Sequence, residues 1–125
     1  MDTNDWNDAE QRVERAQELF EQHKWQEALD ELLLATTINP YNGGWFFNIG
    51  LTLDEMHRYD EAIEAFQHAI RMDPAQVDAH WRLARLYASM GRRQEAAAEF
   101  AKAKDLNKER DEPLATKITA TPRTN

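Results

Sequence analysis

Two arginines, Arg82 and Arg85, form the most chemically specific pair in a chain whose formal net charge is −8. Side chains three residues apart on a helix are neighbours on its surface. Two guanidinium groups in that arrangement can bind a carboxylate through paired hydrogen bonds. These residues therefore predict recognition of an acidic group, such as an acidic side chain or the C-terminal carboxylate of a peptide.

Other residues give little support to catalysis or metal binding. The chain has no cysteine, which excludes thiolate zinc sites and cysteine nucleophiles. Its single serine, Ser89, lacks the flanking glycines of a hydrolase nucleophile. Gly43 and Gly44 lack the rest of a phosphate-binding motif, and the histidines lack the spacing of a helical metal site. We therefore expect a non-enzymatic protein without metal or cofactor. The histidines are His23, His57, His68 and His80.

The charge is unevenly distributed along the chain. Residues 1–42 carry ten acidic and three basic side chains (−7), and residues 43–76 carry six and two (−4). Residues 77–125 carry seven acidic and ten basic side chains (+3), and the three segments sum to −8. An acidic chain is a poor binder of nucleic acid or of an anionic membrane, since both need a basic surface.

The N-terminal residues and the hydropathy pattern bear on location. No apolar run approaches the roughly 20 residues that span a bilayer. The first six residues are acidic and do not resemble a signal peptide. The sequence therefore predicts a cytoplasmic protein that does not bind membranes.

Residues of matching type recur every 34 positions, which reveals the architecture. The repeat divides the chain into units 9–42, 43–76 and 77–110, with a lead-in 1–8 and a tail 111–125 that we expect to be flexible. The matched sets are Ala28, Ala62 and Ala96; Ala35, Ala69 and Ala103; Leu32, Phe66 and Phe100; Ala16, Gly50 and Ala84; Pro40 and Pro74.

Each unit has the pattern of two helices. In the second unit apolar residues recur at helical spacing over 46–53 and again over 62–70, and Asp73-Pro74 ends the second run. Asp8 followed by Gln11 predicts an N-terminal cap for the first helix of the chain. One helix pair cannot bury both of its faces, so three stacked pairs must share a continuous core.

The repeated unit resembles the tetratricopeptide repeat. The second unit matches best, whereas the first carries Arg12 and Arg15 at large apolar sites and the third carries Lys108 in place of the final proline. The resemblance implies an all-α fold, a right-handed solenoid of three antiparallel helix pairs that acts as a non-catalytic interaction module. The matching residues of the second unit are Phe46, Ile49, Gly50, Leu53, Ala62, Phe66 and Pro74.

In this family the first helix of each unit lines a concave groove that binds peptides, and the equivalent positions here supply the candidate site. Val13, Phe47 and Trp81 are 34 residues apart and form an apolar ladder, which either contacts a peptide or packs internally. The predicted peptide-binding residues are Val13, Gln17, Phe47, Asn48, Leu51, Trp81, Arg82 and Arg85.

Some members of the family bind the C-terminal tails of chaperones through five polar residues. Asn48 and Arg82 match that set, whereas Val13, Gln17 and Asp78 do not. The sequence therefore favours a looser site for an acidic segment or C-terminal carboxylate over such a clamp.

Three functional hypotheses follow from the resemblance and the charge. The leading one is an adaptor that binds a peptide segment of a partner protein. The second is a homo-oligomeric scaffold, in which the acidic first unit of one copy docks on the basic last unit of another. The third, RNA binding as in a related family of 35-residue repeats, is opposed by the 34-residue period and the net charge of −8.

Overall fold

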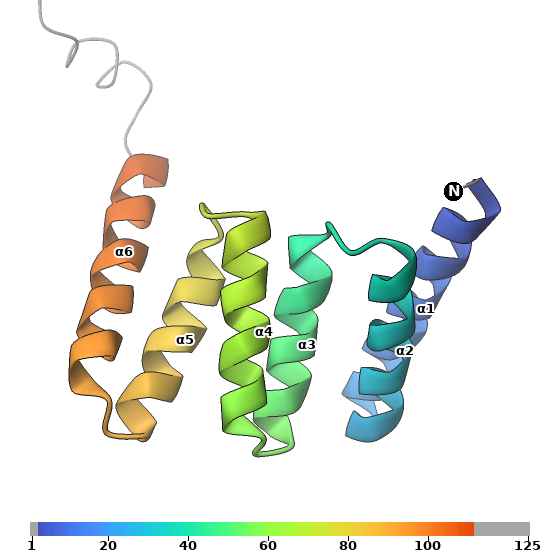
Figure 1. Cartoon of the computed structure of the whole chain (residues 1–125), viewed down its shortest axis with the longest axis horizontal. Helices are drawn as coiled ribbons and strands as arrows, with labels where there is room; N and C mark the ends of the chain where they lie inside the picture. Colours follow the sequence, from blue (N-terminus) through green and yellow to red (C-terminus); the bar gives the residue numbers. More distant parts are fainter. Residues whose placement is uncertain (1–2, 112–125) are drawn as a thin grey trace, which may run out of the picture.

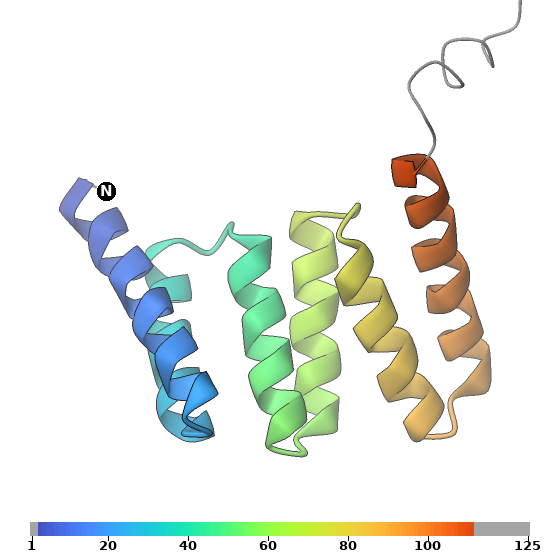
Figure 2. The ribbon, with the colours of Figure 1, turned by 180° about the vertical axis from the view of Figure 1, so that it is seen from behind.

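The computed structural model describes residues 3–111, which fold into six helices and contain no strand. The helices stand in one row and alternate in direction (Figure 1), and α1 lies in front of α2 when the row is seen from behind (Figure 2). This arrangement confirms the predicted all-α solenoid of helix pairs. The helices are α1 (Thr3–Glu21), α2 (Trp25–Ile38), α3 (Gly43–Glu55), α4 (Tyr59–Met72), α5 (Val77–Ser89) and α6 (Arg93–Asp111).

The turns inside the three helix pairs share one backbone conformation. His23, His57 and Gly91 occupy equivalent positions and have φ angles of 61°, 59° and 77°. A left-handed residue costs about 1 kcal/mol unless it is glycine, so the two histidines adopt this conformation because the turn demands it. Two of the four histidines are thereby explained as turn residues.

The core runs through the helix pairs, and Phe66 of α4 is the largest of its fully buried side chains. Phe66 is fully buried, and a Cβ atom built on Gly50 of α3 would lie 2.6 Å from its ring. Glycine at position 50 therefore lets α3 approach the aromatic ring more closely than any other residue permits. In the first unit the equivalent residues are Ala16 and Leu32. Leucine is smaller than phenylalanine, so the facing position can hold an alanine in place of the glycine.

The first helix begins earlier than its predicted cap. Residues 3–8 of the predicted lead-in are helical and belong to α1, and Asp8 lies inside the helix. Its carboxylate accepts a hydrogen bond from Nε of Arg12 at 3.1 Å instead of capping the helix end. At the other end α6 reaches Asp111, so the predicted flexible tail 111–125 falls, apart from Asp111, outside the described residues.

Arg12, which breaks the repeat pattern in the first unit, has a structural role. Its guanidinium lies 3.1 Å from Oε2 of Glu31 on α2, so it ties the two helices of the unit together. Arg15 reaches the same carboxylate at 3.9 Å. The large apolar contact expected at these positions is therefore replaced by ion pairs.

Candidate functional site

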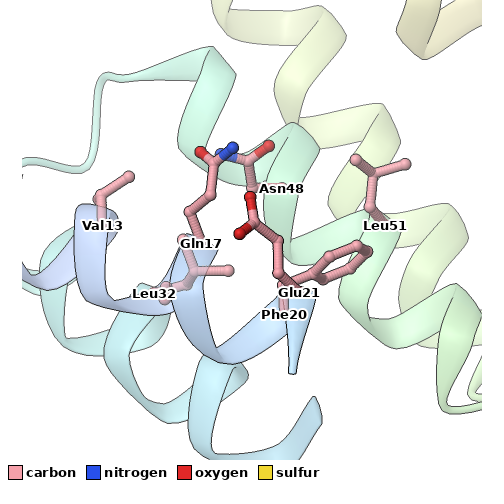
Figure 3. A pocket seen from close by; sticks show the side chains of 8 residues that line it. Val13, Gln17, Phe20, Glu21, Leu32, Asn48 and Leu51 are labelled. Carbon is pink, nitrogen blue, oxygen red and sulfur yellow. The ribbon is translucent and has the colours of Figure 1, made fainter. Parts of the chain in front are cut away.

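A pocket of about 280 Å³ opens between α1 and α3, in the groove where the family resemblance places a peptide. Val13, Gln17, Asn48 and Leu51, half of the eight predicted site residues, line it. Ala16 and Leu32, which belong to the core, also line it, so the pocket is apolar at its base. Figure 3 shows the remaining two lining residues, Phe20 and Glu21, which come from the last turn of α1.

The side-chain amides of Gln17 and Asn48 point toward one another across the pocket (Figure 3). Neither side-chain amide makes a hydrogen bond to another described residue. Besides the backbone bonds of α3, Asn48 accepts one bond from Thr52 Oγ1 at 2.8 Å, through its main-chain oxygen. An amide group has both donors and acceptors. The two side chains are thus available to bind the main chain of a ligand.

Phe20 and Glu21 line the pocket but are not among the eight predicted peptide-binding residues. Phe20 packs edge-on against Trp25 at a ring-centroid distance of 4.8 Å, which fixes it as one wall of the pocket. Glu21 is exposed and adds a negative charge to the rim. The sequence indicates both residues through helical spacing, since the last turn of the first helix faces the same groove as Val13 and Gln17.

Phe47 and Trp81, two members of the apolar ladder, pack inside their own units. The ring of Phe47 lies 5.6 Å from that of Phe66, and the ring of Trp81 lies 5.3 Å from that of Phe100. Both side chains are half-buried and neither lines the pocket. The ladder therefore contributes to packing, and only Val13 reaches the pocket.

Arg82 and Arg85 lie on α5, apart from the pocket. Neither guanidinium makes a hydrogen bond or an ion pair with a described residue, and Arg85 is exposed. Burial, followed by the charge of Glu55, raises the pKa of Asp54 on α3, and the charges of Arg82 and Arg85 oppose this effect. The electrostatic partner of the two arginines is thus Asp54 of the neighbouring unit.

The site therefore has two parts with different chemistry. The first, between α1 and α3, is an apolar pocket with unpartnered amides and one carboxylate. The second, on α5, is a pair of unpaired guanidinium groups near Asp54. Among residues 3–111 no group of three or more histidine or acidic side chains is placed to hold a metal ion.

The fold and the site define a helical-repeat interaction domain, and sequence comparison assigns its family. The sequence profile of the tetratricopeptide repeat matches residues 55–118, about half of the chain. The chain belongs to the tetratricopeptide repeat family. Membership in this family, together with the solenoid fold, supports a role as a protein–protein interaction module.

Individual relatives agree with this assignment. The chain is 27% identical over 82 residues to the protein O-mannosyl-transferase TMTC3 of Mus musculus, and 32% identical over 79 residues to the inactive TPR repeat-containing thioredoxin TTL3 of Arabidopsis thaliana. These alignments cover 66% and 63% of this chain but only 9% and 11% of the two relatives. The chain therefore corresponds to a small part of each relative.

Solved structures show the same solenoid. A crystal structure of MamA superposes with a TM-score of 0.82 at 28% identity, over 84% of this chain and 61% of that chain. The TPR domain of Arabidopsis OM64 superposes with a TM-score of 0.80 at 22% identity, over 91% of this chain and 92% of that domain. At that identity the OM64 domain supports the fold alone.

No helix among the described residues combines the length and the apolar character needed to cross a membrane.

Proposed function

We propose that this chain is an adaptor that binds an extended peptide segment of a partner protein in the groove between α1 and α3. The observation that carries this proposal is the pocket of about 280 Å³ with the unpartnered amides of Gln17 and Asn48 at its rim. Pockets for drug-sized ligands start at roughly 300 Å³. This pocket is slightly smaller, so it suits a single apolar side chain of a peptide.

The amides of Gln17 and Asn48 supply the hydrogen-bonding groups that an apolar pocket lacks. A peptide in extended conformation presents main-chain N–H and C=O groups that need partners when they leave water. Gln17 and Asn48 offer both donors and acceptors to that main chain. Apolar contact with Val13, Phe20 and Leu51 then provides most of the affinity, since a few buried anchors dominate peptide interfaces.

The arginine pair on α5 extends the site to an acidic residue or a C-terminal carboxylate of the same peptide. Arg82 and Arg85 have no ion-pair partner among the described residues, which supports this assignment. Asp54 reduces their joint positive field, so the contribution is a modest one. Phe47 and Trp81 help by holding α3 and α5 in place through their contacts with Phe66 and Phe100.

A random peptide library displayed on phage tests the proposal directly. Peptides selected on the wild-type protein are measured by fluorescence polarisation against Leu51→Glu, which places a charge in the pocket wall. The matched control is Leu34→Glu, an identical change at an exposed site of α2 that does not line the pocket. We expect Leu51→Glu to weaken binding about tenfold or more, the loss of one buried anchor, and Leu34→Glu to leave it unchanged.

The same selection tests each finer element. Gln17→Ala combined with Asn48→Ala is expected to weaken every selected peptide, whereas Arg82→Ala combined with Arg85→Ala weakens only those with an acidic residue or a free C-terminus. A library that enriches no peptide, or peptides that bind Leu51→Glu as well as the wild type, would rule out the groove as the binding site.

Self-association is a second candidate, favoured by the exposed end of the solenoid. Ile63 of α4 is buried, but the equivalent residue of α6, Ala97, is exposed, as are Ala98 and Ala101. Lys104 stands where the second unit has Ile70, and the exposed Glu14 and Glu18 on α1 provide opposite charges. Sedimentation equilibrium at two salt concentrations decides the matter: head-to-tail assembly requires a mass that rises with protein concentration and falls with added salt.

A further inference from the structure

A second, smaller cavity lies at the N-terminal end of α1, outside the groove described above. Its volume is about 140 Å³, and none of its lining residues is shared with the larger pocket. We call it the tryptophan notch. It is lined by Trp6 and Glu10 of α1, Asn39 and Asn42 of the loop that follows α2, and Trp45 of α3.

Two departures from the repeat pattern meet at this notch. The helices α3 and α5 begin at the first residue of their units, but α1 begins six residues earlier, and Trp6 lies on that extension. Trp45 occupies a position where the third unit has Ala79, which is completely buried. Packing of the repeat requires neither indole, since the second junction between units closes with an alanine.

The notch is open and held in place. Trp6 is 57% exposed, an unusual state for the largest apolar side chain, and Trp45 is half-buried. Both asparagine side chains are fixed, because Asn39 Oδ1 accepts from the amide of Tyr41 and Asn42 Oδ1 from the amide of Trp45, each at 3.1 Å. The loop is therefore ordered before any ligand arrives, which lowers the entropic cost of binding.

The charge of the notch is negative. Glu10 is exposed and is the only charged residue among those that line it. Arg12, the nearest basic residue in the sequence, is engaged by Asp8 and Glu31 at 3.1 Å each. Residues 1–42, the lead-in and the first unit together, carry a net charge of −7, so their field attracts cations.

We propose that the tryptophan notch binds a cationic side chain, arginine or lysine, in a basic segment of a partner protein. An indole face attracts a cation more strongly than any other aromatic side chain. Glu10 supplies the counter-charge, and the acidic first unit increases the rate of encounter. This site does not depend on the groove: a partner can use either alone or both together.

Nuclear magnetic resonance of the indole N–H groups gives a readout at the site itself, because the chain has only four tryptophans. The probe is the peptide acetyl-Gly-Arg-Gly-Arg-Gly-amide, and its twin has citrulline, which is neutral and of the same shape, in place of arginine. We expect the arginine peptide to shift the signals of Trp6 and Trp45 saturably and to leave those of Trp25 and Trp81 unmoved. The citrulline peptide should shift none of them.

Two substitutions on α1 form a matched pair. Glu10→Gln removes the carboxylate of the notch, and Glu14→Gln removes an exposed carboxylate one turn further along the helix, outside the notch. We expect Glu10→Gln to weaken the arginine peptide about threefold to tenfold and Glu14→Gln to change it by less than about twofold. Trp6→Ala, with helicity checked by circular dichroism, should abolish the shift at Trp45.

The proposal is overturned if the citrulline peptide shifts Trp6 and Trp45 equally, if Glu10→Gln and Glu14→Gln behave alike, or if neither indole responds. Leu51→Glu separates this result from that of the groove. The substitution blocks the α1–α3 pocket but leaves the notch intact, so retained shifts at Trp6 and Trp45 in this variant support the notch whatever the outcome of the library selection.

Discussion

The middle unit and the two outer units hold their helix pairs together with different chemistry at the same positions. In the middle unit the ring of Phe46 packs on that of His68 at a tilt of 33°, with ring centroids 3.8 Å apart, and Ala65 stands at the position equivalent to Glu31. At the equivalent positions the first unit pairs Arg12 with Glu31 at 3.1 Å, and the third pairs His80 with Glu99 at 2.6 Å. One backbone arrangement thus accepts either an apolar contact or a polar pair.

The two polar pairs differ in burial. The side chains of Arg12 and Glu31 are 34% and 19% exposed, whereas those of His80 and Glu99 are 4% and 14% exposed. Nδ1 of His80 lies 2.6 Å from the Glu99 carboxylate, and Nε2 lies 3.1 Å from the main-chain oxygen of Pro74. Both partners are acceptors, so both contacts are hydrogen bonds only when the imidazole carries two hydrogens.

The strength of the contact between the two helices of a unit depends on how well that contact is shielded from water. The middle unit has a neighbour on each side and is stabilised by buried apolar surface. The third unit has no neighbour after α6 among the described residues, and a shielded polar contact between His80 and Glu99 ties α5 to α6. The first unit uses an ion pair that water partly screens, which contributes less.

Phe66→Ala is expected to have the largest effect, because it removes the side chain at the centre of the middle unit. A fully buried phenylalanine replaced by alanine costs about 3–5 kcal/mol. The matched control is Phe100→Ala in the third unit, where the equivalent ring is half-buried and the loss should be about half as large. Urea unfolding followed by circular dichroism measures both. Equal losses would contradict the contrast between the middle and outer units.

Glu99→Ala is expected to have the next largest effect. It leaves Nδ1 of the buried His80 without its partner at 2.6 Å, and losing a buried hydrogen bond to a carboxylate costs up to about 3 kcal/mol. Glu31→Ala removes the equivalent carboxylate of the first unit, where exposure limits the cost to about 1 kcal/mol. Unfolding free energies of the two variants, measured at one pH, compare the pairs directly. A loss for Glu31→Ala as great as that for Glu99→Ala would show that burial does not decide their strength.

Gly50→Ala tests the close approach that distinguishes the middle unit. The added Cβ atom would lie 2.6 Å from the Phe66 ring, and overpacking of this kind costs about 1–3 kcal/mol. Phe66→Leu in the same chain recreates the Ala16 and Leu32 pair of the first unit and should recover much of the loss. A double-mutant cycle of unfolding free energies measures this coupling. Additive losses would show that the glycine does not matter for this contact.

The fold could be predicted from the sequence because the 34-residue period fixes helices, turns and core positions together. The start of α1 could not be predicted in this way. Asp8 and Gln11 have the spacing of a capping box, but the helix already begins at Thr3. Cap signals are local and do not exclude a helix that begins further upstream, as α1 does at Thr3.

The candidate site was partly predictable for a similar reason. Repeat positions identify which side chains face the groove, and four of them line the pocket. They do not tell whether an aromatic residue such as Phe47 turns toward the ligand or onto Phe66 in its own unit. The polar pairs between helices left a separate signal in the sequence, which the periodicity of apolar residues hides. Glu31 and Glu99 are two repeat lengths of 34 residues apart, as are their partners Arg12 and His80.

The smallest expected effect is a pH dependence that arises from His68 of the middle unit. Burial, followed by the nearby charge of Arg71, lowers the pKa of His68 below its ordinary value of 6.5. As pH falls below 6.5 the unfolded chain takes up this proton before the folded chain does, so the stabilisation of the neutral ring on Phe46 is lost between 6.5 and the lower folded-state pKa.

The variant His68→Leu, which introduces the residue found at the equivalent position of the first unit, removes this dependence while it keeps an apolar contact with Phe46. We therefore expect the wild type to lose more stability than His68→Leu between pH 7.5 and pH 5.5, and the difference measures His68 alone because His23, His57 and His80 are common to both chains. An NMR titration of the imidazole protons provides the direct test. A pKa for His68 at or above that of histidine in an unfolded peptide would show that the ring on Phe46 is not kept neutral by burial.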